Sequence, residues 1–330
     1  MLLVKAIKAG VFVLEKTAGM QIGKAWDDPA LGAILRKVRS GRLEPGLELI
    51  RQAREDHQLR ALRVDKLADA AKSHTEALAR LAGGDPDGLL WLGAARIQEA
   101  WAIRGGSYAK YVGEERFTRF LQVLGTAEEP LRRAADLLPA DPVPWNVLQW
   151  HAIGMGSGRT ELDRLWKELI ARNPGLYAGH HSRTQALCEK WYGSHAELLA
   201  FAAETVAAAE PGDPVVSVLP MAHIEIVIAQ QRDREGLFDE KLVMAHFSDP
   251  AVAEPLIEAS DKWLSRLQPH PLALEARHLF GAAFYYGGHL SRAQGLLAGA
   301  GRRMPDNQPW TVASLTPARR YAKARRELGL

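Results

Sequence analysis

Apolar residues along this chain recur mostly at helical spacing. The clearest example is the stretch from Leu274 to Pro305, which predicts two helices joined by a turn at Gly287 and Gly288. Small and large apolar positions fall on one side of each helix: Phe280, Gly281 and Phe284 in the first, and Ala293, Leu297 and Ala300 in the second. The small residues let two helix backbones approach closely, while the large ones fill the space between successive hairpins. The pattern predicts a helical hairpin.

The second helix of this hairpin has three earlier counterparts. The spacing of Ala293, Leu297, Ala300 and Pro305 recurs at Ala127, Leu131, Ala134 and Pro139, at Leu162, Trp166, Leu169 and Pro174, and at Ala202, Val206, Ala209 and Pro214. Four copies of one pattern predict stacked helical hairpins. The first helices fit less well, because Gln149 and Trp150 stand where a large apolar and a small residue are expected.

Helical spacing and breaker residues predict further helices along the rest of the chain. They cover residues 2–17, 30–39, 45–54, 57–81, 89–103, 215–231, 235–246 and 250–267, with a last helix that opens at Pro317. We divide the chain into N-terminal helices or divergent hairpins (1–84), a central set of hairpins (85–215) and C-terminal hairpins that end in a basic helix (216–330). No low-complexity linker separates these segments. We therefore expect one continuous array.

The hairpin at 274–305 resembles a tetratricopeptide repeat. Gly, aromatic, Ala, large apolar, Ala and Pro residues fall at that family's spacing, and Arg277 stands where an aromatic residue is usual. The resemblance implies an all-α fold, a right-handed α-solenoid of stacked hairpins, whose concave face binds a partner. It implies an architecture rather than one particular activity.

Residues 85–215 also resemble a bacterial family of tetratricopeptide-like proteins that carries a domain of unknown function. The first part of the resemblance is a Lys-Trp-x-Gly-Ser turn followed by Phe-Ala, which is matched by Lys190, Trp191, Gly193, Ser194, Phe201 and Ala202. The second part consists of two upstream groups that each contain a tryptophan: Trp101, Arg104 and Gly105, and Asp141, Pro142 and Trp145. It implies no activity. It adds the expectation that these aromatic and basic residues line one shared surface.

Composition agrees with a folded helical protein. Apolar residues make up 47% of the 330 residues and charged residues 25%, which is ordinary for a globular chain. The net charge of +3 is too small to indicate nucleic-acid binding, but it is unevenly distributed. Residues 201–262 hold 12 acidic and 4 basic residues, and residues 263–330 hold 10 basic and 3 acidic ones. These segments either bind partners of opposite sign or pack against each other.

The number of cysteines and the hydropathy of the chain indicate in which cellular compartment the protein is expected. The single cysteine, Cys188, excludes an internal disulfide and a cysteine-rich zinc site and suits a reducing environment. The apolar stretch from Met1 to Leu14 is interrupted by Lys5 and Lys8 and is too short to span a bilayer. It predicts a helix that docks on the first hairpin, or else a surface amphipathic helix. We expect a cytoplasmic protein without a membrane span.

Side chains that could take part in catalysis or metal binding are densest between Tyr177 and Phe201. His181 and Cys188 are seven residues apart, about 10.5 Å along a helix, so they do not touch directly. His180, His181 and His195 are potential metal ligands, but adjacent histidines point about 100° apart on a helix and no His-Glu-x-x-His spacing occurs. The sequence predicts no metal site or cofactor and leaves catalysis open.

Tryptophan and basic residues give the leading functional hypothesis. We expect a non-catalytic protein-interaction module that binds a partner protein or peptide on the concave face, without nucleic acid. Its predicted binding residues are Trp101, Arg104, Trp145, Trp150, His180, His181, Lys190 and Trp191. The alternatives are inter-hairpin packing for the tryptophans, and a helical enzyme, metal-binding or small-ligand-binding protein with a site near His180, His181 and Trp150.

Overall fold

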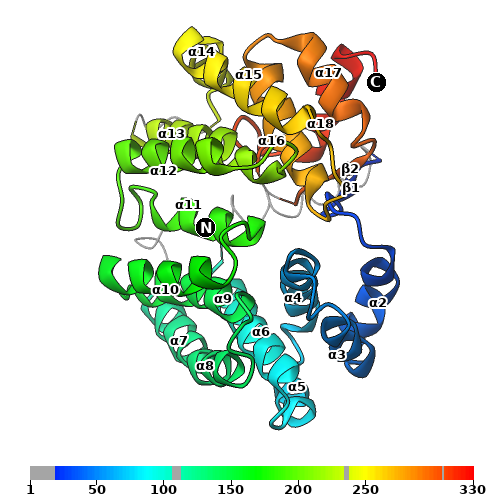
Figure 1. Ribbon diagram of the computed structural model, residues 1–330, viewed down its shortest axis with the longest axis vertical. Coiled ribbons are helices and arrows are strands. Elements are labelled where there is room, and N and C mark those ends of the chain that lie inside the picture. Colours follow the sequence, from blue (N-terminus) through cyan, green and yellow to red (C-terminus); the bar gives the residue numbers. More distant parts are fainter. Residues whose placement is uncertain (1–18, 106–112, 234–237, 307) are drawn as a thin grey trace. The chain divides into compact units, whose positions relative to one another are not determined.

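The computed structural model describes residues 19–105, 113–233, 238–306 and 308–330. Within these ranges the chain is almost wholly α-helical (Figure 1), which confirms the predicted all-α class. Only two strands occur there, β1 (Gln21–Ile22) and β2 (Arg303–Met304), and they form one parallel pair. The sequence did not predict this pair. The helix expected at residues 2–17 lies outside the described ranges.

The described chain forms two compact units. The α2–α11 unit runs from Asp28 to Ala186, and the α12–α18 unit combines the residues up to Asp27 with those from Leu187 to Leu330. These limits differ from the three segments drawn from the sequence, which ended at residues 84 and 215. In the α12–α18 unit, the β1–β2 pair joins the first described residues to the C-terminal part of the chain.

Helices of the α2–α11 unit follow one another with short connections. They are α2 (Pro29–Arg39), α3 (Glu44–Arg51), α4 (His57–Ala71), α5 (Thr75–Ala82), α6 (Pro86–Arg104), α7 (Glu114–Gly125), α8 (Glu128–Leu137), α9 (Val143–Met155), α10 (Arg159–Arg172) and α11 (Tyr177–Ala186). The single helix expected over 57–81 is two helices, because the chain turns at residues 72–74 and a new helix begins at Thr75.

The α12–α18 unit contains the remaining elements. They are α12 (His195–Ala208), the short 3-10 helix η2 (Pro214–Ser217), α13 (Val218–Asp233), α14 (Glu240–Ser248), α15 (Pro250–Leu264), α16 (Ala273–Tyr286), α17 (Leu290–Ala298) and α18 (Pro317–Glu327). Residues 214–232 are long and apolar enough to cross a membrane, but they are mostly buried inside the structure, as a core helix is.

The predicted hairpin at 274–305 is present as α16 and α17. Gly281 faces Leu297 so closely that a Cβ atom on Gly281 would lie 2.6 Å from the Leu297 side chain. Phe280 and Phe284 are fully buried beside this contact, and Gly288 takes a positive φ of 80° in the turn. The small and large residues therefore act in packing as their spacing predicted.

A comparable close contact occurs in the α2–α11 unit. A Cβ atom on Gly93 of α6 would lie 2.4 Å from Leu131 of α8. Leu131 was predicted to occupy the position of Leu297, but here α7 stands in sequence between the two packed helices. The additional helix explains why the first-helix pattern was hard to recognise in this part of the chain.

Many helices begin in the same way, with Asp followed by Pro. Asp28, Asp85, Asp213 and Asp249 accept a hydrogen bond from a backbone amide in the first turn of the following helix, with Pro as its first residue. Asp141, before Pro142, accepts one from the Val143 amide at 2.9 Å. Pro fits this position because its missing N–H group would have no helical partner.

Helix α4 contacts elements far from it in sequence. Besides α2, α3 and α6, it touches α9 and α11 of the same unit. In a regular solenoid each repeat contacts only its neighbours. The contacts of α4 with α9 and α11 are an addition to that arrangement, and they gather several helix N-termini around one helix.

Candidate functional site

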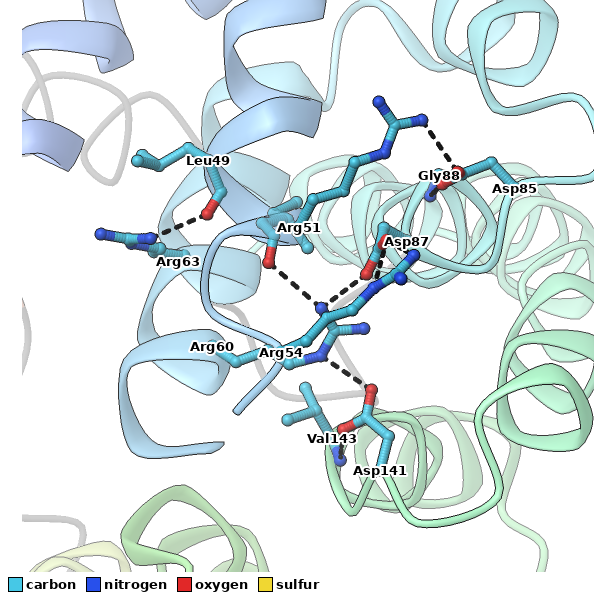
Figure 2. Close-up of polar contacts among 11 residues, drawn as sticks. Leu49, Arg51, Arg54, Arg60, Arg63, Asp85, Asp87, Gly88, Asp141 and Val143 are labelled. Carbon is cyan, nitrogen blue, oxygen red and sulfur yellow. Dashed lines mark hydrogen bonds and ion pairs between the residues drawn. The ribbon is translucent and has the colours of Figure 1, made fainter. Parts of the chain in front are cut away.

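Arg60 of α4 is a fully buried side chain of the α2–α11 unit with three hydrogen-bond partners (Figure 2). Its guanidinium donates to Asp141 Oδ2 at 2.8 Å, to Asp87 Oδ1 at 2.6 Å and to the Ile50 carbonyl at 3.2 Å. Arg60, Asp87 and Asp141 are 1%, 0% and 6% exposed. Since a buried charge is tolerated only when paired and hydrogen-bonded, these contacts hold the starts of α6 and α9 on α4.

Two further arginines surround the start of α6. Arg54 pairs with Asp87, and Arg51 donates to Asp85 Oδ2 at 2.8 Å (Figure 2). The hydrogen bond to Asp87 raises the pKa of Arg54. Burial acts to raise the pKa of Asp85, but hydrogen bonds from the Gly88 amide and Arg51 outweigh it and hold that pKa below its usual value. Asp85 is therefore retained as a carboxylate near the N-terminus of α6.

Helix α4 also contacts two more helix starts. Arg63 donates to Asp28 Oδ2, before α2, and to the Leu49 carbonyl, both at 2.8 Å. Gln58 donates to the Gly175 carbonyl at 2.7 Å and accepts from the Tyr177 amide at 3.1 Å, at the start of α11. The N-terminal half of α4 thus binds the first turns of α2, α6, α9 and α11. We call this set of contacts the α4 hub.

The α4 hub was not predicted from the sequence. Arginines on a helix with no clear apolar stripe gave no local indication that they would be buried. The recurrent Asp-Pro pairs at 28–29, 85–86 and 141–142 were the available signal, because they mark helix starts whose carboxylates need partners. Its paired charges give the hub a structural role.

A different group of side chains lies at the C-terminal end of α6. The Arg104 guanidinium lies over the Trp101 indole, 5.1 Å from the ring centroid, and the Trp101 and Phe120 centroids are 5.2 Å apart. Burial lowers the pKa of Arg104. Among the residues that the structure describes, no carboxylate pairs with Arg104; its guanidinium donates only to the Gly105 carbonyl, at 3.4 Å. Trp101 and Arg104 were predicted as binding residues, and they do lie together.

Two exposed apolar side chains lie on α7 and α9, the helices that pack against α6 near this pair. Phe117 of α7 is 38% exposed, and its ring centroid lies 5.9 Å from that of Phe120. Met155, also 38% exposed, follows Gly154 of α9, where a Cβ atom would lie 3.3 Å from the Trp101 ring. We call Trp101, Arg104, Phe117 and Met155 the Trp101 patch. Sequence reasoning missed Phe117 and Met155, whose exposure depends on how α7 and α9 pack.

The other two predicted tryptophans of this unit lie on α9 and are half-buried. Arg172 covers Trp145, with its guanidinium 4.7 Å from the ring centroid. Arg172 also donates to the Pro139 and Glu168 carbonyls, both at 2.6 Å. Trp145 therefore packs beneath an arginine that is held in place. Trp150 is five residues further along α9, on a different face.

His180 and His181 lie on α11, at the second site considered from the sequence. His180 Nε2 donates to the Pro174 carbonyl at 2.7 Å, and its ring lies edge-on to Trp166. Burial lowers the pKa of His180, partly offset by that hydrogen bond. His181 packs on Tyr177, with centroids 4.2 Å apart. The Nε2 nitrogen of His180 is therefore engaged within the fold, as a donor to this carbonyl.

No set of three His, Cys, Asp or Glu side chains in the described ranges is arranged to hold a metal ion.

Lys190 and Trp191, the last predicted binding residues, belong to the α12–α18 unit. Lys190 Nζ lies 2.7 Å from Glu225 Oε2, a carboxylate that is almost fully buried and also accepts from Gln308 at 2.6 Å. Cys188 is buried near the same carboxylate, and burial together with Glu225 raises the pKa of its thiol. A thiol that stays protonated is a poor nucleophile. Trp191 is half-buried in the turn that follows.

The acidic and basic segments of the α12–α18 unit partly pack against each other. Arg320 of α18 pairs with Glu240 of α14, and Arg292 of α17 lies 2.6 Å from Asp261 of α15. This was one of the two alternatives left open by the charge distribution.

Comparison with known proteins identifies no relative. None of the family models, the curated proteins or the solved structures that were compared matches this chain. The two family resemblances drawn from its motifs therefore stay predictions.

Proposed function

We propose that this chain is a non-catalytic protein-interaction module that binds a peptide segment of a partner protein through the Trp101 patch. The observation that carries the proposal is the environment of the Arg104 guanidinium. Its guanidinium is partly withdrawn from water and stacked on Trp101, and no described carboxylate neutralises it. The other predicted cation, Lys190, is already paired with Glu225.

The chemistry of the patch suggests which peptide fits. A carboxylate would restore to Arg104 the interactions that burial removes, and charge-assisted hydrogen bonds to a guanidinium are strong and directional. Phe117 and Met155, on the neighbouring helices α7 and α9, offer exposed apolar contact area. We therefore expect a peptide with an Asp or Glu residue next to an aromatic or aliphatic side chain.

We also propose the finer architecture, a right-handed α-solenoid with the peptide on its concave face. The α16–α17 hairpin and the Gly93–Leu131 contact support the hairpin packing on which this rests. Trp101 and Met155 lie on α6 and α9, the first helices of their hairpins, and such helices line the inner face of tetratricopeptide-like arrays.

The titratable side chains support binding rather than catalysis. Cys188 is a buried thiol whose pKa is raised, and burial lowers the pKa values of His180 and His223. The acids of the α4 hub are occupied by arginines. These groups have partners that account for them within the fold.

The proposal can be tested by selecting peptides on the purified protein. A displayed library of random linear peptides should yield sequences that combine an acidic residue with an aromatic or aliphatic neighbour. Binding of one selected peptide, measured by fluorescence anisotropy, should weaken about tenfold or more in Arg104→Gln and in Phe117→Ser, because each removes a central contact.

Leu137→Ser is the matched control, since Leu137 of α8 is 50% exposed in the same unit but outside the patch. It should bind the peptide as the unchanged protein does. Circular dichroism should show equal helix content for all variants. Peptides whose affinity is indifferent to both patch substitutions would contradict the proposal.

A further inference from the structure

The outward face of α18 carries a row of basic residues. Arg319, Lys323 and Arg326 are exposed at positions i, i+4 and i+7, which places them along one side of the helix. The other two arginines of α18 point into the unit: Arg320 pairs with Glu240, and Arg325 donates to the Gly301 carbonyl at 2.6 Å. Helix α18 therefore directs two of its arginines into the unit and leaves three basic side chains exposed to solvent.

An acidic row of the same spacing lies on α15. Glu254, Glu258 and Asp261 are exposed at i, i+4 and i+7. Asp261 is 55% exposed at its side chain even though it pairs with Arg292, while no ion pair involves Glu254 or Glu258 within the described ranges. Seven residues of helix correspond to about 10.5 Å, so the two rows have equal length.

Both rows place like charges next to each other. Glu254 and Glu258, like Arg319 and Lys323, are four residues apart, a spacing at which equal charges destabilise a helix. Lys323 is relieved in part by Glu327, 3.5 Å away.

The outer helices of the α2–α11 unit are built differently, with opposite charges at this spacing. The pairs are Glu128–Arg132 and Glu129–Arg133 on α8, and Arg159–Asp163 and Glu168–Arg172 on α10.

We propose that two copies of this chain associate, with the acidic row of α15 in each copy facing the basic row of α18 in the other. One partner then neutralises both rows at once, which neither an acidic peptide nor a nucleic acid would do. Because each copy supplies both rows, the contact is reciprocal and closes as a symmetric dimer. An interface of exposed charges is sensitive to salt.

Two variants with reversed charges test the pairing. Glu254→Lys/Glu258→Lys converts the acidic row, and Arg319→Glu/Lys323→Glu converts the basic row. Sedimentation velocity in about 50 mM salt, where screening is weak, should show a dimer for the unchanged protein and monomers for each variant alone. An equimolar mixture of the two variants should form dimers again, because each reversed row then meets a row of opposite sign. Raising the salt to about 0.5 M should weaken the unchanged dimer tenfold or more.

A control separates pairing from net charge. Glu55→Lys/Glu76→Lys changes the net charge as much as the acidic-row variant does, at exposed positions of the other unit, and should leave the dimer intact. A monomer at every concentration of the unchanged protein would overturn the proposal. So would a mixture of the two variants that remains monomeric, and so would binding of nucleic acid or an acidic peptide that depends on the α18 row alone.

Discussion

His223 and His246 show how single residues in this protein depend on their surroundings. Their ring nitrogens Nδ1 and Nε2 lie 3.1 Å apart, one on α13 and the other on α14. Burial, together with the neighbouring His246, lowers the pKa of His223 from 6.5 to about 4. Burial also lowers the pKa of His246, against the opposing effect of Asp249. Both imidazoles are therefore neutral near pH 7.

This pair makes the stability of the α12–α18 unit dependent on pH. In the unfolded chain His223 binds a proton below about pH 6.5, whereas in the folded unit it does so only near pH 4. Between these values the unfolded state binds more protons, so stability falls as the pH falls. From pH 7.5 to 5 we expect His223 to account for a loss of about 2 kcal/mol.

Urea unfolding at the two pH values measures this effect. His223→Gln removes the titrating group and should reduce the pH-dependent loss by roughly that amount. The carboxylates titrate in both proteins, so the difference between the two losses isolates the histidine. Equal losses in the variant and the unchanged protein would show that His223 does not titrate in this way.

Contacts between residues close in sequence could be predicted, whereas contacts between distant residues could not. Trp101 and Arg104 are three residues apart on one helix, so their proximity follows from helical spacing. Arg60 and Asp141 are separated by 81 positions, and their contact depends on where α4 and α9 pack. No local pattern contains that information.

At the scale of elements, the α4 hub predicts which arginines matter for stability. Arg60→Met should destabilise the α2–α11 unit by about 3–5 kcal/mol, because it leaves buried Asp141 and Asp87 without a main partner. Arg51→Met removes a pair with the neighbouring Asp85, but the Arg51 side chain is 40% exposed, so the loss should stay below about 1 kcal/mol.

The two variants form a matched set, since each replaces an arginine that binds a carboxylate at the start of α6. Urea unfolding gives the free energies, and hydrogen exchange should show reduced amide protection at the first turns of α6 and α9 in Arg60→Met only. Similar losses in both variants would refute the structural role assigned to burial.

The positions of most helices could be predicted from the sequence, but which helices pack against each other could not. Apolar spacing with Gly and Pro breakers placed most helices, and Gly281 with Leu297 also identified their contact. The turn at residues 72–74 escaped notice because apolar spacing continues through it. The pairing of α6 with α8 across α7 also requires tertiary information.

At the scale of the whole molecule, the α12–α18 unit depends on residues far apart in the chain. The Gln21 amide donates to the Arg302 carbonyl at 2.8 Å and the Lys24 amide to the Met304 carbonyl at 2.9 Å. Ala25 is buried with Leu274 and Ala300. A two-residue strand pairing across this distance gives no sequence signal, which is why we expected one array and not a unit closed by its N-terminal segment.

Ala25→Asp should therefore loosen this unit selectively. An unpaired charge among Leu274 and Ala300 should cost at least about 2 kcal/mol. Hydrogen exchange should increase around Met304 and in α16 and α17, while α6 and α9 keep their protection. Gln21→Asp, which adds the same charge at an exposed position of β1, should change little. Equal effects in both units would contradict this division of the chain.

The β1–β2 pairing also has a consequence for biosynthesis. As the polypeptide leaves the ribosome, the α2–α11 unit emerges complete, while the strand at Gln21 has to wait for Arg303, some 280 residues later. At about 5–20 residues per second the delay is on the order of 15 to 60 seconds. Throughout that interval the nascent N-terminal segment lacks its native strand partner and is available to chaperones.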